Sequence, residues 1–345
     1  MSPRTAPARR SLTRRAALAA ALVTVAFGSA CAQGETSTGS APAASSSGGD
    51  AAAPVVRLDF AFYNPLSLVV KERGLLEAAG VTPQWEQSLG SNKANEFLRN
   101  DNLDVASTAG AAVLQARANG SPVKTIDVYS QPEWTALVVG EGSAITSAAQ
   151  LKGKRIAATT GTDPYFFLQQ ALAANGLSAA DVEIVNLQHG DGRAALERGD
   201  VDAWAGLDPN MATSELQAGS TLLYRNVDFN SYGMLNARED FIDEHPDLAQ
   251  KVVDAYEEAR AWAAANPAEL AALYAQQAQL TPEVAARVLE RTTLDLDPVP
   301  GEAQRQVLAG ILPLMVATGD VKSEQAAQQA LDTLLEPRFA QAAAS

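Results

Sequence analysis

The sequence predicts an α/β protein of two lobes, each a mostly parallel sheet flanked by helices, with a helical C-terminal segment on the first lobe. Strand-like and helix-like runs alternate from residue 56 to residue 236, as in sheets with covered faces. The segment 97–106 is echoed by 195–204, which aligns Asp104 with Asp202. From residue 241 the chain is rich in Ala, Glu and Gln, which favour helix. A chain of 345 residues is long enough for two hydrophobic cores.

The expected elements follow from apolar periodicity and from turn residues. Strands are expected at 56–62, 83–87, 103–106, 123–129, 135–139, 154–158, 182–187 and 201–205, with 222–225 and 231–236 also extended. Helices are expected at 66–79, 91–99, 109–118, 147–151, 164–175, 193–198 and 209–217. Asn64-Pro65, Asn266-Pro267 and Thr281-Pro282 supply a cap and a first helical residue.

The echo places one lobe at 55–134 and 236–337 and the other at 135–235. Chance similarity of two strand–helix units is the alternative explanation. The chain would cross between the lobes near Trp134 and again near Asn236, which makes a hinge. Ligands of open α/β sheets sit beyond the carboxyl ends of the strands, so we expect a ligand in the cleft between the lobes.

The first thirty residues predict export. Five arginines precede a short apolar run at 16–27, and small residues follow it, as in a secretion signal. The apolar run is too short to span a bilayer. Thr13-Arg14-Arg15 resembles a twin-arginine export motif, but the sequence does not decide between export routes.

Cys31 is the only cysteine, so no intrachain disulfide is possible. Its place after Gly28-Ser29-Ala30 resembles a bacterial lipobox, in which the cysteine becomes the lipidated N-terminus of the mature protein. Residues 32–54 are mostly Ser, Ala, Gly, Thr and Pro and form a flexible linker with a mean reach of roughly 25 Å. We expect a lipid anchor on the outer face of the cytoplasmic membrane. The alternative is ordinary cleavage that releases a free periplasmic or secreted protein.

The formal net charge is −14, and removal of the five signal arginines makes the mature chain still more acidic. Nucleic acids and anionic surfaces require a basic face, so neither is expected as a partner. We interpret the acidity as an adaptation for solubility.

The turn at 159–164 has the features of an anion site. It follows a strand and opens a helix, whose first N–H groups and dipole favour negative charge. Gly161 allows close approach of the backbone, and Thr160 and Thr162 add hydroxyl donors. Alternatively, this is a plain capped turn with Asp163 as the N-cap and Pro164 as the first helical residue.

Further side chains are expected at the same cleft. In the first lobe, Ser107 and Thr108 begin the matching turn, and Tyr63 and Asn64 follow the first strand. In the second lobe, apolar walls and polar groups are expected from Tyr165, Trp204, Asp208 and Arg193. The alternatives are core packing for Trp204, a helix cap for Asp208 and an exposed ion pair for Arg193.

The chain lacks the groups that catalysis requires. His189, at the expected end of a strand, and His245, before a proline, are far apart in sequence and show no metal spacing. Residues 32–345 contain no cysteine, and the chain has no Gly-x-Ser-x-Gly elbow and no Gly-rich nucleotide signature. We therefore expect no catalytic residue, no metal and no cofactor.

The order of the landmarks resembles a known family. They are Phe60-Ala61-Phe62-Tyr63, Lys71 to Leu75, Leu103 to Thr108, Leu151 to Ala157, Gly161-Thr162, Val201 to Trp204 and Asp208-Pro209. Together they resemble the ABC-transporter substrate-binding proteins for aliphatic sulfonates, taurine and nitrate. The resemblance implies a periplasmic-binding-protein fold of the second type that closes on its ligand like a hinged clamp. Leu207 stands where relatives often carry an aromatic residue, which leaves the identity of the ligand open.

The resemblance implies a monomeric binding subunit that delivers a sulfonate-like anion to a permease and its ATPase. The alternative ligand is a pyrimidine precursor of thiamine, nitrate or another nitrogen source. An enzyme is the third hypothesis, because relatives of this fold include a sulfinate-cleaving hydrolase and a pyrimidine-forming synthase. Their chemistry implies a cysteine or histidine in the cleft, and here the single cysteine is Cys31.

Overall fold

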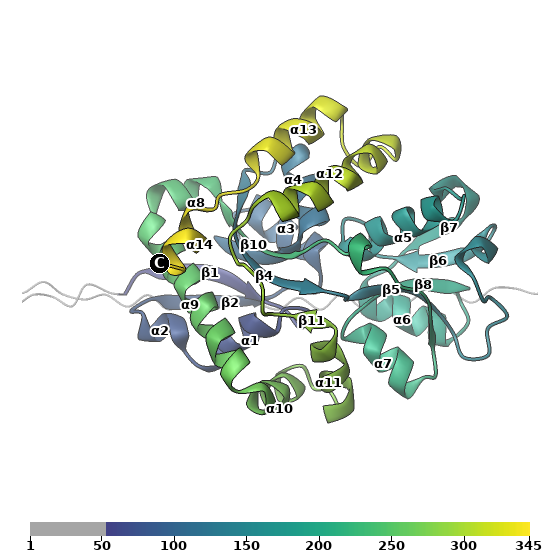
Figure 1. Cartoon of the computed structure of the whole chain (residues 1–345), viewed down its shortest axis with the longest axis horizontal. Coiled ribbons are helices and arrows are strands. Elements are labelled where there is room, and N and C mark those ends of the chain that lie inside the picture. The colour runs from purple at the N-terminus through teal and green to yellow at the C-terminus, as the bar shows by residue number, and fades with distance from the viewer. Residues whose placement is uncertain (1–52) are drawn as a thin grey trace, which may run out of the picture. The chain divides into compact units, whose positions relative to one another are not determined.

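A computed structural model describes residues 53–345. The predictions for residues 1–52, including the signal segment, Cys31 and most of the linker, lie outside this range. The described chain forms two separate sheets, each covered by helices (Figure 1). Two lobes of α/β structure were predicted, and the sheets confirm them.

The first lobe is built on a sheet of six strands. Their order across the sheet is β11-β4-β10-β3-β1-β2. The strands are β1 (Val55–Phe60), β2 (Thr82–Gln87), β3 (Val105–Ala109), β4 (Val123–Pro132), β10 (Gly233–Arg238) and β11 (Thr292–Thr293). Strands β2, β1 and β3 are parallel, and the other pairings are antiparallel.

The second lobe is built on a sheet of five strands in the order β7-β6-β8-β5-β9. The strands are β5 (Thr135–Val139), β6 (Arg155–Ala158), β7 (Glu183–Asn186), β8 (Ala203–Leu207) and β9 (Thr221–Tyr224). Strands β7, β6 and β8 are parallel, and β5 pairs antiparallel with β8 and β9.

Both sheets are therefore mixed, whereas mostly parallel sheets were predicted. The difference lies in the strands next to the crossings. β4 leads through residues 133–134 directly into β5, and the chain returns from β9 to β10. The returning strand β10 lies between β3 and β4 and runs antiparallel to both, so the two crossings lie close together. Figure 1 shows β4 and β5 following one another from the first sheet to the second.

Helices connect and cover the strands. Those of the two lobes are α1 (Pro65–Glu72), α2 (Leu75–Ala78), α3 (Ser91–Arg99), α4 (Gly110–Ala118), α5 (Asp163–Ala174), α6 (His189–Glu197) and α7 (Asn210–Gln217). Those of the C-terminal segment are α8 (Glu239–Glu244), α9 (Pro246–Ala265), α10 (Pro267–Gln277), α11 (Pro282–Glu290), α12 (Glu302–Ala317), α13 (Glu324–Thr333) and α14 (Arg338–Ala343). Within residues 53–345, every helix is too short or too polar to cross a bilayer.

Several helix ends follow from the cap residues that the sequence carries. The Asn64 side chain accepts a hydrogen bond from the Ser67 N–H at 3.3 Å, and Pro65 occupies the first turn of α1. Thr281 caps α11 in the same way before Pro282. Gly176 follows the end of α5 with a φ of +72°, a conformation that favours glycine. These local signals explain why the starts of α1 and α11 and the end of α5 were close to the predicted ones. In contrast, α6 begins four residues earlier than predicted, and the one helix predicted at 66–79 is divided into α1 and α2.

The two lobes repeat one arrangement of backbone and carboxylate. In the first lobe, the Arg57 N–H donates to Asp104 Oδ2 at 2.8 Å and the Asp104 N–H donates to the Arg57 carbonyl at 2.8 Å. In the second lobe, Arg155 and Asp202 make the same two bonds, also at 2.8 Å. Both pairs are separated by 47 residues in the chain. The predicted alignment of Asp104 with Asp202 is confirmed as a structural repeat.

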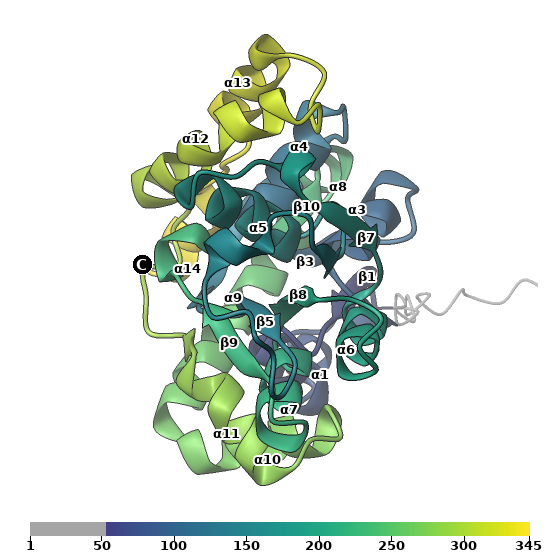
Figure 2. The same ribbon diagram turned by 90° about the vertical axis from the view of Figure 1, so that its right-hand side faces the viewer.

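The C-terminal segment contacts both lobes, although it was expected to pack on the first alone. Both views show α12 and α13 on one side of the first sheet and α10 and α11 on the other (Figures 1 and 2). α11 also reaches α7 of the second lobe, where Arg287 and Arg291 pair with Glu215. On the other side, Phe166 of α5 packs into the apolar cluster formed by α3, α4, α12 and α13.

Candidate ligand-binding site

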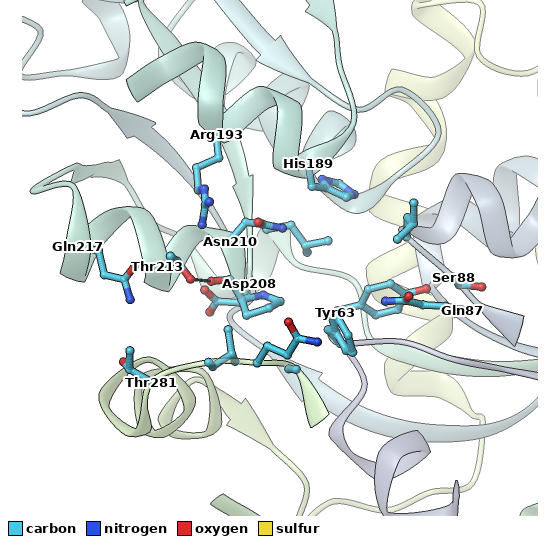
Figure 3. Close-up of a pocket in the computed structure, with 17 residues that line it drawn as sticks. Tyr63, Gln87, Ser88, His189, Arg193, Asp208, Asn210, Thr213, Gln217 and Thr281 are labelled. Atoms are coloured by element: carbon cyan, nitrogen blue, oxygen red, sulfur yellow. Dashed lines mark hydrogen bonds between the residues drawn. The ribbon is translucent and has the colours of Figure 1, made fainter. Parts of the chain in front are cut away.

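A cavity of about 470 Å³ lies between the two lobes, beyond the carboxyl ends of β1, β2 and β8. Its volume is in the range of about 300–1,000 Å³ that is usual for small-molecule sites. Three parts of the chain line it (Figure 3). They are Phe62, Tyr63, Gln87, Ser88 and Leu89 of the first lobe, His189, Arg193, Leu207 to Asn210, Thr213 and Gln217 of the second, and Ala278 to Thr281 of the C-terminal segment.

Tyr63 forms the predicted wall of the first lobe. Its hydroxyl donates to the Ser107 carbonyl at 2.9 Å, and its ring lies edge-on to Trp134 with 6.0 Å between centroids. Burial raises the pKa of Tyr63 well above its ordinary value, so the hydroxyl stays protonated. The ring therefore offers a fixed, apolar surface beside the crossing segment at Trp134.

Two helices of the second lobe supply most of the polar lining. His189 and Arg193 lie one turn apart on α6, so they share a face of that helix. Asn210, Thr213 and Gln217 follow the same helical spacing on α7. Figure 3 shows Arg193 and His189 leaving the same side of the pocket.

Asp208 lines the cavity, but its carboxylate already bonds to other groups of the protein. It is almost fully buried, accepts a hydrogen bond from the Ala212 N–H at 2.8 Å, and lies 3.5 Å from Arg291. The bond to Ala212 is a contact of the helix-capping type that was predicted. Burial raises the pKa of Asp208 to about 7, and the neighbouring Arg291 acts in the opposite direction.

Arg193 is the only arginine or lysine among the described residues that line the cavity, and it pairs with Glu197 of the same helix. Its Nε lies 3.5 Å from a Glu197 carboxylate oxygen and has no hydrogen-bond partner in the described part of the chain. Asp208 is the only acidic residue of the described lining, and it forms an ion pair with Arg291, which does not line the cavity. The guanidinium of Arg193 has further N–H groups beyond the one that faces Glu197, and these can donate to an anionic ligand.

Three of the predicted contacts are buried, and their side chains bond to other parts of the protein. Asn64 caps α1 and donates to Tyr256 at 3.3 Å. The Ser107 hydroxyl donates to Asp59 at 3.0 Å, and the Thr108 hydroxyl accepts from Asn236 at 2.8 Å. None of these three side chains lines the cavity.

The turn at the start of α4, which was expected to match the anion site of the second lobe, does not form such a site. The Ala109 N–H donates to Ser91, the Gly110 N–H to the Tyr232 carbonyl, and the Ala111 N–H to Ser231. Each of these amides was expected to be available for an anion. Segments far away in the sequence satisfy them instead, which the local sequence could not reveal.

The turn before α5 lies at a second, smaller hollow of about 270 Å³. Gly161, with a φ of +74°, lines this hollow together with Asn92, Asn95 and Gln115 of the first lobe. Thr160 is exposed, whereas Thr162 is buried and donates to the Thr159 carbonyl at 2.6 Å. The turn does face the other lobe, but it lies outside the larger cavity.

Asp163 joins the crossing segments of the chain. The predicted N-cap role falls to Thr162, and Asp163 is the first residue of α5. Its carboxylate accepts hydrogen bonds from Trp134 Nε1 at 2.7 Å and from the Ser231 N–H at 2.9 Å, and the Ser231 hydroxyl also donates to it. Trp134 and Ser231 stand on the two connections between the sheets. Asp163 therefore ties the hinge, and burial raises its pKa to about 7.

Tyr165 and Trp204 were expected as walls of the cleft, and both belong to hydrophobic cores instead. Trp204 is fully buried in the second lobe among Ala136, Val138 and Met211. Tyr165 packs edge-on against Phe166 and is half buried. For Trp204, the alternative of core packing was correct.

Other lining residues gave a weaker signal in the sequence or none. His189 was placed at the end of a strand, but it begins α6 and lines the cavity. The i, i+3, i+7 spacing of Asn210, Thr213 and Gln217 after Asp208-Pro209 was a usable signal that we missed. The turn Ala278 to Thr281 is brought to the cavity by the fold of the C-terminal segment, which no local pattern predicts.

The cavity lies in a chain that matches a known family. The family described as NMT1/THI5 like matches residues 65–270. The chain belongs to this NMT1/THI5-like family. A putative aliphatic sulfonates-binding protein of Bacillus subtilis is 32% identical over 232 residues, 65% of this chain and 70% of that protein. The relatives that the family resemblance implied are therefore found.

Solved structures show the same fold. The alkanesulfonate-binding protein SsuA from Xanthomonas axonopodis pv. citri, bound to MOPS, superposes with a TM-score of 0.73. It is 24% identical, and the match covers 81% of this chain and 98% of SsuA. The fold also occurs in an enzyme, because the desulfurization enzyme DSZB superposes with a TM-score of 0.62 at 16% identity, over 84% of this chain and 99% of DSZB. These likenesses show a shared periplasmic-binding-protein fold, as predicted.

Proposed function

We propose that this protein is the exported solute-binding subunit of an ABC importer and captures an aliphatic sulfonate in the cavity between its lobes. The guanidinium of Arg193, which is the only arginine or lysine side chain in the described lining of that cavity, is the observation that carries the proposal. Membership of a family with a sulfonate-binding relative supports it. The permease and ATPase of the importer are its partners in this proposal.

The rest of the lining suits a short carbon chain next to an anionic head. Tyr63, Leu207 and Leu280 provide apolar surface, and each buried CH₂ of a ligand is worth about 0.8 kcal/mol. Asn210, Thr213 and Gln217 add hydrogen-bond donors on the same side as Arg193. A sulfonate has three oxygens that can accept from these donors and from the guanidinium.

The runner-up ligand, a pyrimidine precursor or another nitrogen source, loses its main support. It depended on Trp204 and Tyr165 as aromatic walls, with Asp208 as an acceptor. Trp204 is fully buried, Tyr165 does not line the cavity, and Asp208 is paired with Arg291. The geometry of the cavity therefore favours the sulfonate.

A change of Arg193 to Gln tests the proposal. A hydrogen bond to a charged group contributes about 1.5–3 kcal/mol, so R193Q should weaken sulfonate binding about 10- to 100-fold. Isothermal titration of the chain from residue 53 onward with alkanesulfonates measures the change. The matched control is R198Q, because Arg198 is exposed near the end of the same helix and pairs with Asp200. R198Q should bind as the unchanged protein does.

A thermal-shift panel provides the wider test. A ligand at 100 times its dissociation constant stabilises the folded state by about 2.7 kcal/mol. Alkanesulfonates should raise the melting temperature, whereas nitrate and pyrimidines should not. If every sulfonate leaves the melting temperature unchanged, or if R193Q and R198Q behave alike, this assignment of the cavity is wrong.

We further propose that the cavity binds its ligand without turnover. His189 and Asp208 are the lining residues best suited to proton transfer, and both are engaged with Thr159 and Arg291 respectively. The single cysteine of the chain is Cys31, in the proposed export segment. Sulfite or altered carbon product after incubation with a sulfonate, detected by mass spectrometry, contradicts this part of the proposal.

Export and anchoring complete the proposal. The segment 1–30 directs export, Cys31 becomes the lipidated N-terminus, and residues 32–54 link the anchor to the folded part. Metabolic labelling with a clickable fatty acid tests the anchor. Label on the full chain but none after a change of Cys31 to Ser is the expected result, and an unlabelled full chain indicates the free, exported form.

A further inference from the structure

We propose that Gln279 is a specificity-determining residue whose side-chain carboxamide donates a hydrogen bond to the anionic head of the ligand. Gln279 lies in the turn after α10, which lines the cavity. The inference rests on the proposed function of the same cavity. It adds a contact from the C-terminal segment to those expected from the two lobes.

The turn that carries Gln279 has an unusual backbone conformation. Gln279 has a φ of +54°, in the left-handed region that a residue with a Cβ atom adopts only against steric strain. The turn depends on this conformation, because the Leu280 N–H donates to the Ala275 carbonyl at 2.8 Å and so closes the end of α10. The same turn brings Leu280 and Thr281 to the cavity.

Glycine occupies this position at most of the helix ends where the chain turns in this way. The residue after the helix cap is a glycine with a positive φ at the ends of α1, α2, α4, α5, α6, α7 and α12. Glycine has no Cβ atom, so the conformation is free of strain there. Within residues 53–345, Gln279 and Asp101 are the only residues other than glycine with a positive φ. At these two positions a side chain is present although it lowers stability.

The exception at Asp101 has partners in the protein, whereas Gln279 has none for its side chain. The Asp101 carboxylate forms ion pairs with Arg57 and Arg238. The side chain of Gln279 is exposed and lines the cavity, and no donor or acceptor among residues 53–345 bonds to it. Backbone strain together with an unpaired polar side chain at a binding cavity indicates a function in binding rather than in folding.

The charge of the ligand decides which part of the carboxamide is used. A sulfonate head has only hydrogen-bond acceptors, so the carboxamide contributes its N–H groups. Figure 3 shows Arg193 and Thr281 on opposite sides of Asp208. Gln279 lies two residues before Thr281 in the same lining turn. A sulfonate between them accepts from the guanidinium of α6 on one side and from the carboxamide of the C-terminal segment on the other.

Gln279→Ala and Gln279→Gly separate the side chain from the backbone. Both variants remove the carboxamide, but only glycine also removes the strain of the left-handed turn. Both should bind ethanesulfonate about 3- to 10-fold more weakly than the unchanged protein. Q279G should nevertheless melt roughly 2–4 °C above the unchanged protein, whereas Q279A should melt near it. Isothermal titration and thermal unfolding measure the two quantities, and a purely structural role would not combine higher stability with weaker binding.

Gln279→Glu tests whether the hydrogen bond is donated to an anion. Glutamate has the length of glutamine, but it carries a negative charge and only acceptor oxygens. Repulsion should make Q279E bind ethanesulfonate about 5-fold more weakly than Q279A does, and high salt should reduce this difference. Hexanesulfonate should show the same losses in all three variants, because it shares the sulfonate head and differs only in the carbon chain.

Gln276→Ala in the last turn of α10 is the matched control. Gln276 is exposed, and it does not line the cavity. Q276A removes an equal side chain from the same end of the helix, so it should leave the affinity for both sulfonates unchanged.

The outcomes separate this inference from the proposed function. If the unchanged protein binds neither sulfonate, the proposed function is wrong, and this inference is overturned with it. If the unchanged protein binds them and Q279A binds them equally well, Gln279 has no part in recognition and the proposed function stands. If Q279E binds as tightly as Q279A, or if the losses are confined to hexanesulfonate, the carboxamide does not donate to the anionic head.

Discussion

Four aspartate side chains with raised pKa values are buried in the described part of the chain, and three of them have clear partners. Asp59 bonds to Ser107, Asp163 to Trp134 and Ser231, and Asp208 to Ala212 and Arg291. The fourth, Asp127 of β4, is fully buried, and neither of its oxygens has a hydrogen-bond partner within residues 53–345. Its nearest cation is Arg260, at 3.7 Å.

The protonation of Asp127 makes stability depend on pH. Burial, together with the Glu257 carboxylate, raises the pKa of Asp127 well above its ordinary value of 3.8, and Arg260 only partly opposes this. Above about pH 4 the unfolded chain has lost this proton while the folded chain retains it. The unfolded state then binds fewer protons, so the free energy of unfolding falls as the pH rises through this window.

Asp127→Asn should remove this dependence, because the amide has the same shape and no charge. We expect D127N to melt at least about 3 °C above the unchanged protein at pH 8, or roughly 1 kcal/mol for a chain of this size, and to differ little at pH 4. Melting curves by circular dichroism from pH 4 to 9 measure it. D243N, at an exposed aspartate of α8, is the control. Parallel curves for D127N and the unchanged protein contradict the prediction.

At the scale of elements, local patterns predicted position and type well. The helix at Ser91–Arg99 and the strand at Thr135–Val139 have the predicted bounds, because apolar periodicity and turn residues are local properties. The repeat could be detected in the sequence because Asp104 aligns with Asp202. In both lobes this aspartate bonds to the N–H and the carbonyl of an arginine 47 residues earlier in the chain. Helix α6 began earlier than predicted, which moved His189 from a strand end to a helix start.

The site was less predictable than the elements that carry it. The sequence indicated which turns follow the strands, and of the residues chosen there Tyr63 and Asp208 line the cavity. Ser107 and Thr108 follow a strand as expected, but Asp59 and Asn236 use their hydroxyls. Those partners come from other strands, so only the register of the sheet decides whether a hydroxyl is free for a ligand.

At the scale of the whole described chain, the C-terminal segment connects the two lobes in addition to the crossing strands. Arg291 of the connection after α11 is almost fully buried and pairs with both Asp208 and Glu215 of the second lobe. Arg287, one turn earlier in α11, pairs with Glu215 at 2.8 Å. Glu215 therefore holds α11 against α7, next to the turn Ala278 to Thr281 that lines the cavity.

Glu215→Gln tests this connection. The change leaves the buried Arg291 with Asp208 alone, at 3.5 Å, and an incompletely compensated buried cation is strongly unfavourable. Because Glu215 is about one-quarter exposed, solvent reduces the loss, and we expect a decrease of about 1–3 kcal/mol in the free energy of unfolding. That decrease lowers the melting temperature by roughly 2–4 °C per kcal/mol.

The matched control is Glu290→Gln at the end of α11, the helix that carries Arg287. Glu290 pairs with Arg287 from the exposed side, and its side chain is 74% exposed, so E290Q should change the free energy of unfolding by less than about 0.5 kcal/mol. Urea unfolding of both variants measures the difference, and high salt should reduce the effect of E290Q more than that of E215Q. Equal stabilities for the two variants would mean that α11 rests on α7 without holding the lobes together.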